Sequence, residues 1–589
     1  RLHGGATRSF PMKSLRLYAR NEYTNSNMEY DFFGEGNQPY RRLILRNSGN
    51  DFPTSIWRPD FTSRTMFRDA AIQEVVRHMR FDTQAYRAAV LFINGEYWGI
   101  HNIRERYDRH YIERNYGIDP DNIDLLTGKD EVKEGDNKQY NSIISYIIQN
   151  GVEDDQHYKH IAKHIDTDNF TDYQIANIYA ANTDWPGNNI DFWRLSTDDF
   201  VPNAPEGHDG RWRWMLFDTD FGFGLAGKDG AYNHNTIEFA TESNGPNWPN
   251  PPWSTFLFRK LLENATFRDG FLNRFADQLN TALLPERVFG IITQMQETIA
   301  PEIARHMTRW GNEHTYEQWL ESVEVMKEFA RNRPAFMWAH LLEHFEYNSK
   351  EVVKLDVSNS LAGYIRINTI DILADTPGVG ESPYPWKAYY FRGLPVRIEA
   401  VPAPGYEFSH WEGGLGGSDP VISADPAAGI NIKAHFKKSG KKALLHFWLF
   451  DDNMQNDTPL KQVKSSYSID EGAQINFISA LEGYPFQEGH PLWRKASMER
   501  RNMPTPINYR PQANKDIAYE DAGMRGLQIR QPFSDNGMHN TLIIDLPYRG
   551  YTNTVLKFAA KDEDAVQGLR FDYSDGRPGS EWTDQGLES

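Results

Sequence analysis

Along the first part of the chain, hydrophobic and polar positions alternate as they do in strands, and one stretch has a helical period. "KSLRLYAR" (13–20) and "RRLILRN" (41–47) alternate with a period of two, whereas "RTMFRDAAIQEVVRHM" (64–79) repeats apolar residues at helical spacing. "YRAAVLFINGEYWGIHNIRE" (86–105) has two β-rich runs around an Asn-Gly pair, a strong hairpin signal. The pattern predicts an early sheet with one inserted helix.

From about residue 140 the chain is mostly helical, apart from two short strand-like runs. These runs are "IDFWRLS" (190–196) and "RWRWMLFD" (211–218), and we expect them to form a small hairpin. An early sheet followed by a helical body that carries a hairpin suggests two lobes with a cleft between them. We therefore expect residues 1–347 to form one two-lobed domain.

Two β-rich regions with different sequence patterns follow this domain. Residues 350–437 alternate in strand fashion between Gly/Pro turns, and residues 443–589 contain short strand-like runs at the intervals of a β-sandwich. "KASMERRNMPTPINY" (495–509) is charged and proline-containing, and we expect an exposed loop there. Polar stretches near residues 348 and 440 separate the regions. The predicted fold class is multidomain α+β, with a small β-repeat module and a C-terminal β-sandwich after the first domain.

Composition narrows the functional classes. A chain of 589 residues is too long for a single core, and 39% hydrophobic residues indicate folded domains. The net charge of −18 argues against nucleic acid as a partner, because phosphate backbones require clustered cations. No apolar run approaches the length of a membrane span. Without cysteine, disulfides and thiolate catalysis are excluded. The chain begins inside a strand-like pattern, so we expect a preceding segment, which leaves an export signal open.

One ordered set of polar residues points to chemistry. In "NTDWPGNNIDFWR" (182–194), Asp184 precedes Asn189 by five residues, and the first hairpin strand follows. The second hairpin strand ends at Asp218 in "LFDTDFGFG", and Asp220 comes two residues later. Alone, the two aspartates fit a strand end before a turn as well as a metal site. Protein-kinase-type phosphoryl transfer requires this acid–asparagine–hairpin–acid order, because one aspartate orients the hydroxyl and the other groups hold Mg²⁺.

Residues 1–347 resemble the spore-coat-H (CotH) kinase family, an atypical branch of the protein-kinase fold. The resemblance rests on several stretches in the expected order, of which NGEYWG and D-W-P-G-N-N are the most distinctive. The matching stretches are "HGGATRSFPMKSLRLYAR", "LILRNSGNDF", "MFRDA", "NGEYWGIHNIRERYDRHYI", "NTDWPGNNIDFWR" and "WRWMLFDTDFGFG". The resemblance implies an ATP- and Mg²⁺- or Mn²⁺-dependent kinase that acts on protein Ser or Thr.

The resemblance also implies roles for single residues. Asp184 would be the catalytic aspartate and Asn189 a metal ligand. Asp218 would be the principal metal aspartate, flanked by Asp220; the alternative, with Asp220 as the aspartate of Asp-Phe-Gly, stays open. Two neighbouring carboxylates favour a bound cation.

The candidate nucleotide-binding residues come from three stretches of the sequence. Arg8 and Lys13 flank "HGGATRS", which is either a phosphate-binding loop or a plain turn. Arg46 stands where kinases carry the strand lysine, and its helical partner is either Glu74 or the Arg68-Asp69 pair. Arginine there departs from the ordinary kinase pattern. Glu105, after the hairpin, is the candidate for ribose or adenine contact. The nucleotide-binding set is Arg8, Lys13, Arg46, Glu74 and Glu105.

Residues 350–437 resemble the internalin-B-type β-repeat of bacterial surface proteins. The residues that carry this resemblance are Trp386, Gly393, Ala400, Gly405, Phe408, Trp411 and Phe436. Such modules imply a secreted or surface-attached protein. The alternative function is therefore a non-catalytic, kinase-like adhesin that binds a glycan or a cell-surface protein through its β-modules. Two weaker alternatives are a glycosidase carboxylate pair and a transition-metal site at His157, His160 and His164.

Overall fold

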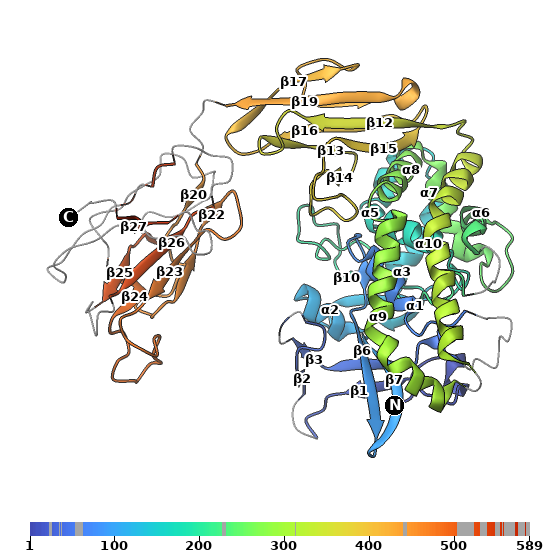
Figure 1. Cartoon of the computed structure of the whole chain (residues 1–589), viewed down its shortest axis with the longest axis horizontal. Helices are drawn as coiled ribbons and strands as arrows, with labels where there is room; N and C mark the ends of the chain where they lie inside the picture. Colours follow the sequence, from blue (N-terminus) through green and yellow to red (C-terminus); the bar gives the residue numbers. More distant parts are fainter. Residues whose placement is uncertain are drawn as a thin grey trace. The chain divides into compact units, whose positions relative to one another are not determined.

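The computed structural model divides the chain into two compact units. One comprises Arg1–Val357, Tyr364–Ala400 and His410–Ala434, and the other Ser358–Gly363, Val401–Ser409 and His435–Ser589. The residues that the structure describes are 1–22, 26–34, 36, 38–53, 63–225, 231–311, 314–439, 444–503, 523–530, 539–547, 554–556, 558, 572–574 and 583–584. The chain is of mixed α/β class with several sheets (Figure 1).

The first unit opens with the predicted sheet. Its strand order is β1-β4-β7-β6, and every neighbouring pair is antiparallel. The strands are β1 (Leu15–Tyr18), β4 (Arg42–Arg46), β6 (Tyr86–Ile93) and β7 (Glu96–Glu105), with the short β2 (Met28–Glu29) and β3 (Pro39–Tyr40) paired apart. Asn94 and Gly95 both have positive φ in the β6–β7 turn, which confirms the hairpin prediction.

The inserted helix is shorter than its apolar pattern predicts. Helix α1 runs Arg68–Val76, whereas the pattern spans 64–79. Met66 has φ of 74°, in the left-handed region, and its neighbour Phe67 is the N-cap. The helical spacing at the start of the pattern therefore comes from a buried turn, because a left-handed residue cannot continue a right-handed helix.

The two hairpin strands belong to a second sheet, with order β5-β11-β10-β8-β9. The strands are β5 (Asp82–Thr83), β8 (Ile123–Thr127), β9 (Glu131–Glu134), β10 (Asp191–Leu195) and β11 (Arg213–Leu216). Strands β10 and β11 pair antiparallel, as predicted. The pattern missed β8 and β9. A buried cluster covers this sheet and contains Tyr107, Tyr111, Ile112, Ile118, Ile123, Leu125, Trp193 and Met215.

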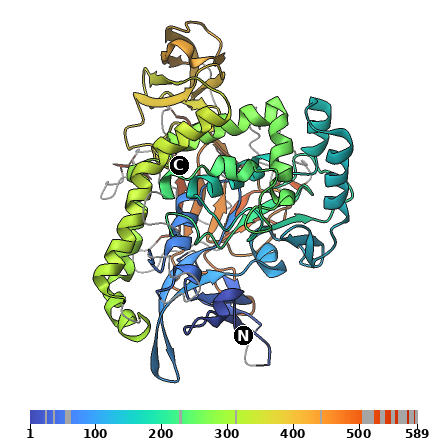
Figure 2. The same cartoon turned by 90° about the vertical axis from the view of Figure 1, so that its right-hand side faces the viewer.

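Helices make up most of the remainder to residue 344. They are α2 (Arg109–Tyr116), α3 (Lys138–Asn150), α4 (Asp155–Ile161), α5 (Thr167–Ala180), α6 (Thr236–Thr241), α7 (Pro252–Glu263), α8 (Ala265–Leu279), α9 (Pro285–Trp310) and α10 (Tyr316–His344). Helices α9 and α10 lie side by side (Figures 1 and 2), and α9 also packs against β7 and α1. Among the described helices, none is long and apolar enough to cross a membrane.

Two four-stranded sheets follow the helices, with orders β15-β12-β19-β17 and β14-β13-β16-β18. Their strands are β12 (Lys350–Val357), β13 (Gly363–Ile367), β14 (Ile370–Asp371), β15 (Trp386–Phe391), β16 (Val396–Pro402), β17 (Tyr406–Gly413), β18 (Val421–Ala424) and β19 (Ile430–Lys438). Strand β12 pairs antiparallel with β15 and parallel with β19.

Helix α8 is joined to these strands by buried polar contacts. The Asp277 carboxylate accepts hydrogen bonds from the Asn368 amide (3.1 Å), the Thr369 hydroxyl (2.7 Å) and the Tyr390 hydroxyl (2.8 Å). Burial raises the pKa of Asp277 to about 6. Beyond the helix end, Asn280 donates to the Tyr389 carbonyl (2.7 Å) and accepts from its N–H (2.9 Å).

The described residues of the second unit beyond residue 443 form short strands. They are β20 (His446–Phe447), β21 (Gln462–Lys464), β22 (Tyr467–Ser468), β23 (Gln474–Ile478), β24 (Ser497–Arg500), β25 (Leu527–Arg530), β26 (Thr541–Asp545), β27 (Asp572–Tyr573) and β28 (Thr583–Asp584). The expectation of an exposed loop at 495–509 is wrong at β24, whose residues are all buried; residues 504–509 lie outside the described part. The β-sandwich remains a prediction.

Candidate functional site

Asp184 lies in the loop between α5 and β10 and is held by four hydrogen bonds. The Asn188 amide donates to both carboxylate oxygens (3.1 Å each), and Asn189 donates to Oδ2 (3.0 Å). The fourth hydrogen bond comes from the indole N–H of Trp248, 2.6 Å from Oδ1. Burial, and to a lesser extent the charge of Asp218, raises the pKa of the Asp184 carboxyl. The carboxylate is therefore held in one orientation.

Asn189 connects the Asp184 loop to the far end of the hairpin. The same side-chain amide that donates to Asp184 also lies 3.3 Å from the backbone carbonyl of Asp218. The register of β10 on β11 pairs Asp191 with Met215, so the residue before one strand meets the residue after the other. Both Asn189 (φ 55°) and Asp218 (φ 53°) are left-handed, as in tight loops at strand ends. The hairpin thus brings these groups together.

Arg46 links the two aspartates after β11. Its Nη2 donates to Asp218 Oδ1 and, at 2.7 Å, to Asp220 Oδ2. The Asp218 side chain is 32% exposed, whereas that of Asp220 is 1% exposed. Burial and the neighbouring Asp218 raise the pKa of Asp220 well above its usual value, although Arg46 acts in the opposite direction. Of the two, Asp218 is the carboxylate that a ligand can reach.

The loop after β4 encloses Asp220. The Asn50 backbone N–H donates to Asp220 Oδ2 (2.9 Å), and its side-chain amide lies 3.3 Å from Oδ1. Gly49 has φ of 64°, and a Cβ there would lie 2.1 Å from Asp220 Oδ2. Only glycine permits this approach. Sequence reasoning missed both residues, although "NSGND" directly after the strand was a signal.

Asp69, on α1, is the acid that faces Arg46 from the helix. Its carboxylate lies 3.9 Å from Arg46 and 3.3 Å from Arg104, and it accepts from the Thr219 N–H at 2.9 Å. Although burial opposes ionisation, Arg104 and Arg46 hold the pKa of Asp69 below its usual value. Glu74 is exposed on the same helix and pairs with Arg77 at 3.9 Å. Of the sequence alternatives, the structure brings Asp69 rather than Glu74 to Arg46.

A group of cations lies near this cluster around His3. Arg16 Nε is 2.9 Å from His3 Nδ1, and Lys13 Nζ donates to the Arg8 carbonyl at 2.7 Å. Burial lowers the pKa of His3 to about 3, and the charges of Arg46, Arg16, Arg106 and Arg8 add to this effect. In the described part of the chain, Arg8, Lys13 and Arg16 have no carboxylate partner in an ion pair. This face of a net-acidic protein can therefore receive an anion.

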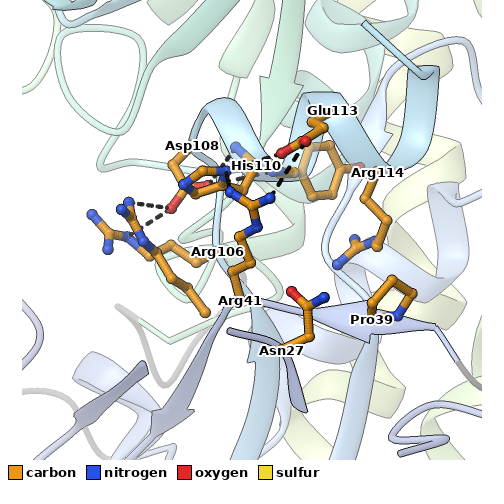
Figure 3. Close-up of a pocket in the computed structure, with 10 residues that line it drawn as sticks. Asn27, Pro39, Arg41, Arg106, Asp108, His110, Glu113 and Arg114 are labelled. Atoms are coloured by element: carbon orange, nitrogen blue, oxygen red, sulfur yellow. Dashed lines mark hydrogen bonds and ion pairs between the residues drawn. The ribbon is translucent and has the colours of Figure 1, made fainter. Parts of the chain in front are cut away.

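A pocket of about 250 Å³ lies where β4 and β7 meet α2 (Figure 3). Figure 3 shows Arg41, Arg106, Asp108, His110 and Glu113 gathered at its wall. The lining residues are Asn27, Pro39, Arg41, Arg42, Arg106, Asp108, His110, Tyr111, Glu113 and Arg114.

Glu105 does not line this pocket but contacts one of the residues that do. Its carboxylate is bound by Arg114, which does line the pocket, and by the Ala85 N–H at 2.8 Å.

His157, His160 and His164, the residues of the alternative transition-metal site, contact other side chains and each other. His157 hydrogen-bonds the Tyr146 hydroxyl at 2.8 Å, and the rings of His160 and His164 lie 5.0 Å apart. His164 also contacts the Gln139 amide at 3.0 Å. Within the described ranges, no group of three or more His, Asp or Glu side chains could hold a metal ion.

Comparison with known families gives two matches. A family model described as CotH kinase protein matches residues 1–337, more than half of the chain. A model described as Divergent InlB B-repeat domain matches residues 378–440. No curated protein matches the chain. The first match contains the whole cluster around Asp184 and Asp218, and the second overlaps the predicted β-repeat module, 350–437, and extends three residues beyond it.

Proposed function

The chain belongs to the CotH kinase protein family, and on that premise we propose that it transfers the terminal phosphoryl group of ATP to a Ser or Thr hydroxyl of a protein. One observation carries the proposal: Asp184 and Asp218 share Asn189 as a neighbour, with hydrogen bonds of 3.0 and 3.3 Å, although they are separated by a hairpin. Phosphoryl transfer depends on positioning and on charge stabilisation, which such a group supplies.

Asp184 is assigned to the acceptor hydroxyl. Its carboxylate would accept the hydrogen bond of the incoming hydroxyl and later its proton, while Asn188 and Asn189 hold its orientation. Arg46 forms ion pairs with both Asp218 and Asp220, and its charge also acts on His3, around which the other cations lie. We assign Arg8, Lys13 and Arg46 to the phosphates, with Arg16 added, and Glu105 to the ribose or adenine end beside the pocket.

The donor set also fits a hard divalent cation. Mg²⁺ in kinases is held by one or two protein oxygens together with the substrate phosphates, not by an all-protein cage. The partly exposed Asp218 carboxylate and the side-chain oxygen of Asn189 would hold Mg²⁺ or Mn²⁺, next to the buried Asp220. Burial, together with the neighbouring Asp218 carboxylate, raises the pKa of Asp220, and a bound cation would offset the repulsion between the two carboxylates. When bound, the ion supplies charge neutralisation at the phosphates.

A kinase-like, two-lobed arrangement is part of the proposal. The sheet β1-β4-β7-β6 with α1 would form the smaller lobe, and the hairpin β10–β11 with the helices would form the larger one. Arg46 and Asp69 come from the first set of elements, whereas Asp184 and Asp218 come from the second. The ion pairs of Arg46 with Asp218 and Asp220 support a site between the two sets.

The test separates nucleotide binding from transfer. We expect Asp184→Asn to leave the Kd for Mg-ATP unchanged and to slow transfer to a mixture of Ser and Thr peptides by roughly a hundredfold or more. Asp218→Asn should instead weaken Mg-ATP binding, because a ligand charge is lost. Calorimetry and radiolabel transfer measure the two quantities. The matched control is Asp168→Asn, an exposed aspartate on α5. Wild-type transfer rates in both site variants would refute the assignment.

The second candidate is a non-catalytic adhesin, favoured by the match to a Divergent InlB B-repeat domain. Such repeats resemble modules of bacterial surface proteins, which also supports a secreted or surface-attached location. Binding of Mg-ATP without transfer to any peptide, together with binding to a glycan array, would favour this candidate over the kinase.

A further inference from the structure

The loop between α6 and α7, residues 242–251, reaches the Asp184 loop. Trp248 donates its indole N–H to Asp184 Oδ1 at 2.6 Å, and 48% of the residue is nevertheless exposed. Its ring lies 6.2 Å from that of Phe221, edge to face. A large aromatic side chain that is half exposed and bound to a buried carboxylate is not explained by packing alone.

The backbone fixes this loop from both sides. The Gly187 N–H donates to the Pro249 carbonyl at 2.6 Å, and the buried Asn250 amide donates to the Phe239 carbonyl at 3.1 Å. A Cβ on Gly187 would lie 2.3 Å from the Pro251 ring. Glycine is therefore required for the two loops to meet, and the position of Trp248 over Asp184 is built into the fold.

The donors around Asp184 leave limited room for a substrate hydroxyl. Oδ1 accepts from Asn188 and Trp248, and Oδ2 accepts from Asn188 and Asn189. A carboxylate offers about two lone-pair sites on each oxygen. The four hydrogen bonds occupy these sites, so a hydroxyl that reaches Asp184 must share a carboxylate oxygen with one of the three donors, and of these Trp248 is the one with an exposed apolar ring.

We propose that Trp248 is a positioning and specificity-determining residue on the acceptor side: its N–H orients Asp184, and its exposed ring packs against the side chain next to the phosphorylated hydroxyl. The inference rests on the proposed kinase function and deepens it. The substrate class is a protein segment in which an apolar or aromatic residue adjoins the acceptor Ser or Thr, because an indole face recognises such side chains by burial.

Two variants separate the two roles. Trp248→Phe keeps most of the ring and removes the N–H, so we expect a lower kcat with little change in the KM of a Leu-flanked Ser peptide. Trp248→Ala removes both, so the KM of that peptide should also rise about tenfold, the scale of losing roughly half of one buried apolar side chain. The KM of a Gly-flanked peptide should change little. The Kd for Mg-ATP, measured by calorimetry, should stay at the wild-type value in both variants.

The control for ring loss is Phe92→Ala, since Phe92 is 52% exposed on β6. A second readout is independent of activity and of the alanine variant's folding. In protein labelled with ¹⁵N at the indoles, the Trp248 N–H signal, identified by its loss in Trp248→Phe, should shift in Asp184→Asn and stay in place in Asp168→Asn.

The outcomes are distinguishable. Transfer by the wild type with kcat and peptide KM unchanged in both Trp248 variants would overturn the inference and leave the proposed function standing. An indole signal that is insensitive to Asp184→Asn would overturn the positioning role. If the wild type transfers phosphate to neither peptide, the proposed function fails, and the inference fails with it.

Discussion

The buried Asp277 predicts that stability decreases as the pH rises. Its carboxylate is fully buried between α8 and the strands that follow the helices, and burial raises its pKa from 3.8 to about 6. Between these values the folded chain keeps a proton that the unfolded chain has lost. The stabilisation is therefore complete below pH 3.8 and is lost as the pH passes 6.

The magnitude follows from the shift. A change of about two pKa units corresponds to about 3 kcal/mol, because one unit is worth about 1.4 kcal/mol. Asp277→Asn has no such titration. It replaces one acceptor oxygen with an amide and so loses bonds from Thr369 or Tyr390, but that cost is the same at every pH. The wild type should therefore lose roughly 2 to 2.5 kcal/mol relative to the variant between pH 4 and pH 7, because at pH 4 the unfolded chain is already more than half deprotonated at this site.

Hydrogen exchange of α8, followed by mass spectrometry, measures this difference locally, without assuming that the whole chain unfolds in one step. The matched control is Asp269→Asn on the same helix, where the carboxylate is 42% exposed and pairs with Arg268 at 3.5 Å. Because the Asp269→Asn variant keeps Asp277, it should retain the loss of protection between pH 4 and pH 7. An offset between wild type and Asp277→Asn that stays constant from pH 4 to pH 7 would refute the reasoning.

Two further predictions concern the backbone. In thermal unfolding, Gly49→Ala should lower the free energy of unfolding by at least twice as much as Gly95→Ala. Both glycines have positive φ, which costs about 1 kcal/mol for alanine. Of the two, Gly49 is the position where an added Cβ would meet a buried carboxylate. Equal losses would contradict the close approach. Limited trypsin digestion should cut the lysine-rich stretch at 437–442 before the stretch at 346–351. The reason is that hydrogen bonds join α8 to the strands that follow residue 351. Earlier cleavage at 346–351 would contradict this order.

The sequence predicted elements whose signal is local. The β6–β7 hairpin follows from an Asn-Gly pair that adopts positive φ, and β10 and β11 follow from short apolar runs. Helix α1 begins later than its pattern because Met66 takes a left-handed conformation that no periodicity reveals. The buried strand β24 was missed because its charged residues are neutralised inside the fold: Glu499 pairs with Arg494 at 2.9 Å.

The candidate site divides in the same way. Asp184, Asn189, Asp218 and Asp220 could be predicted because a short hairpin fixes where its two ends meet. Asp69 was one of the two alternatives that the sequence offered for the helical partner of Arg46. The partners Asn50 and Trp248 could not be predicted, because their hydrogen bonds to Asp220 and Asp184 join residues that are 170 and 64 positions apart in the chain. Such contacts depend on how elements pack, which composition and spacing do not encode.

The paired hydrogen bonds between Asn280 and Tyr389 protect an edge. Strand β15 is the outermost strand of its sheet, and the Asn280 amide occupies both the N–H and the carbonyl of Tyr389, as a neighbouring strand would. A truncated protein that begins after α10 would expose these groups and offer a template for strand addition. The repeat region taken alone should therefore self-associate edge to edge, although it reads as a separable module in the sequence.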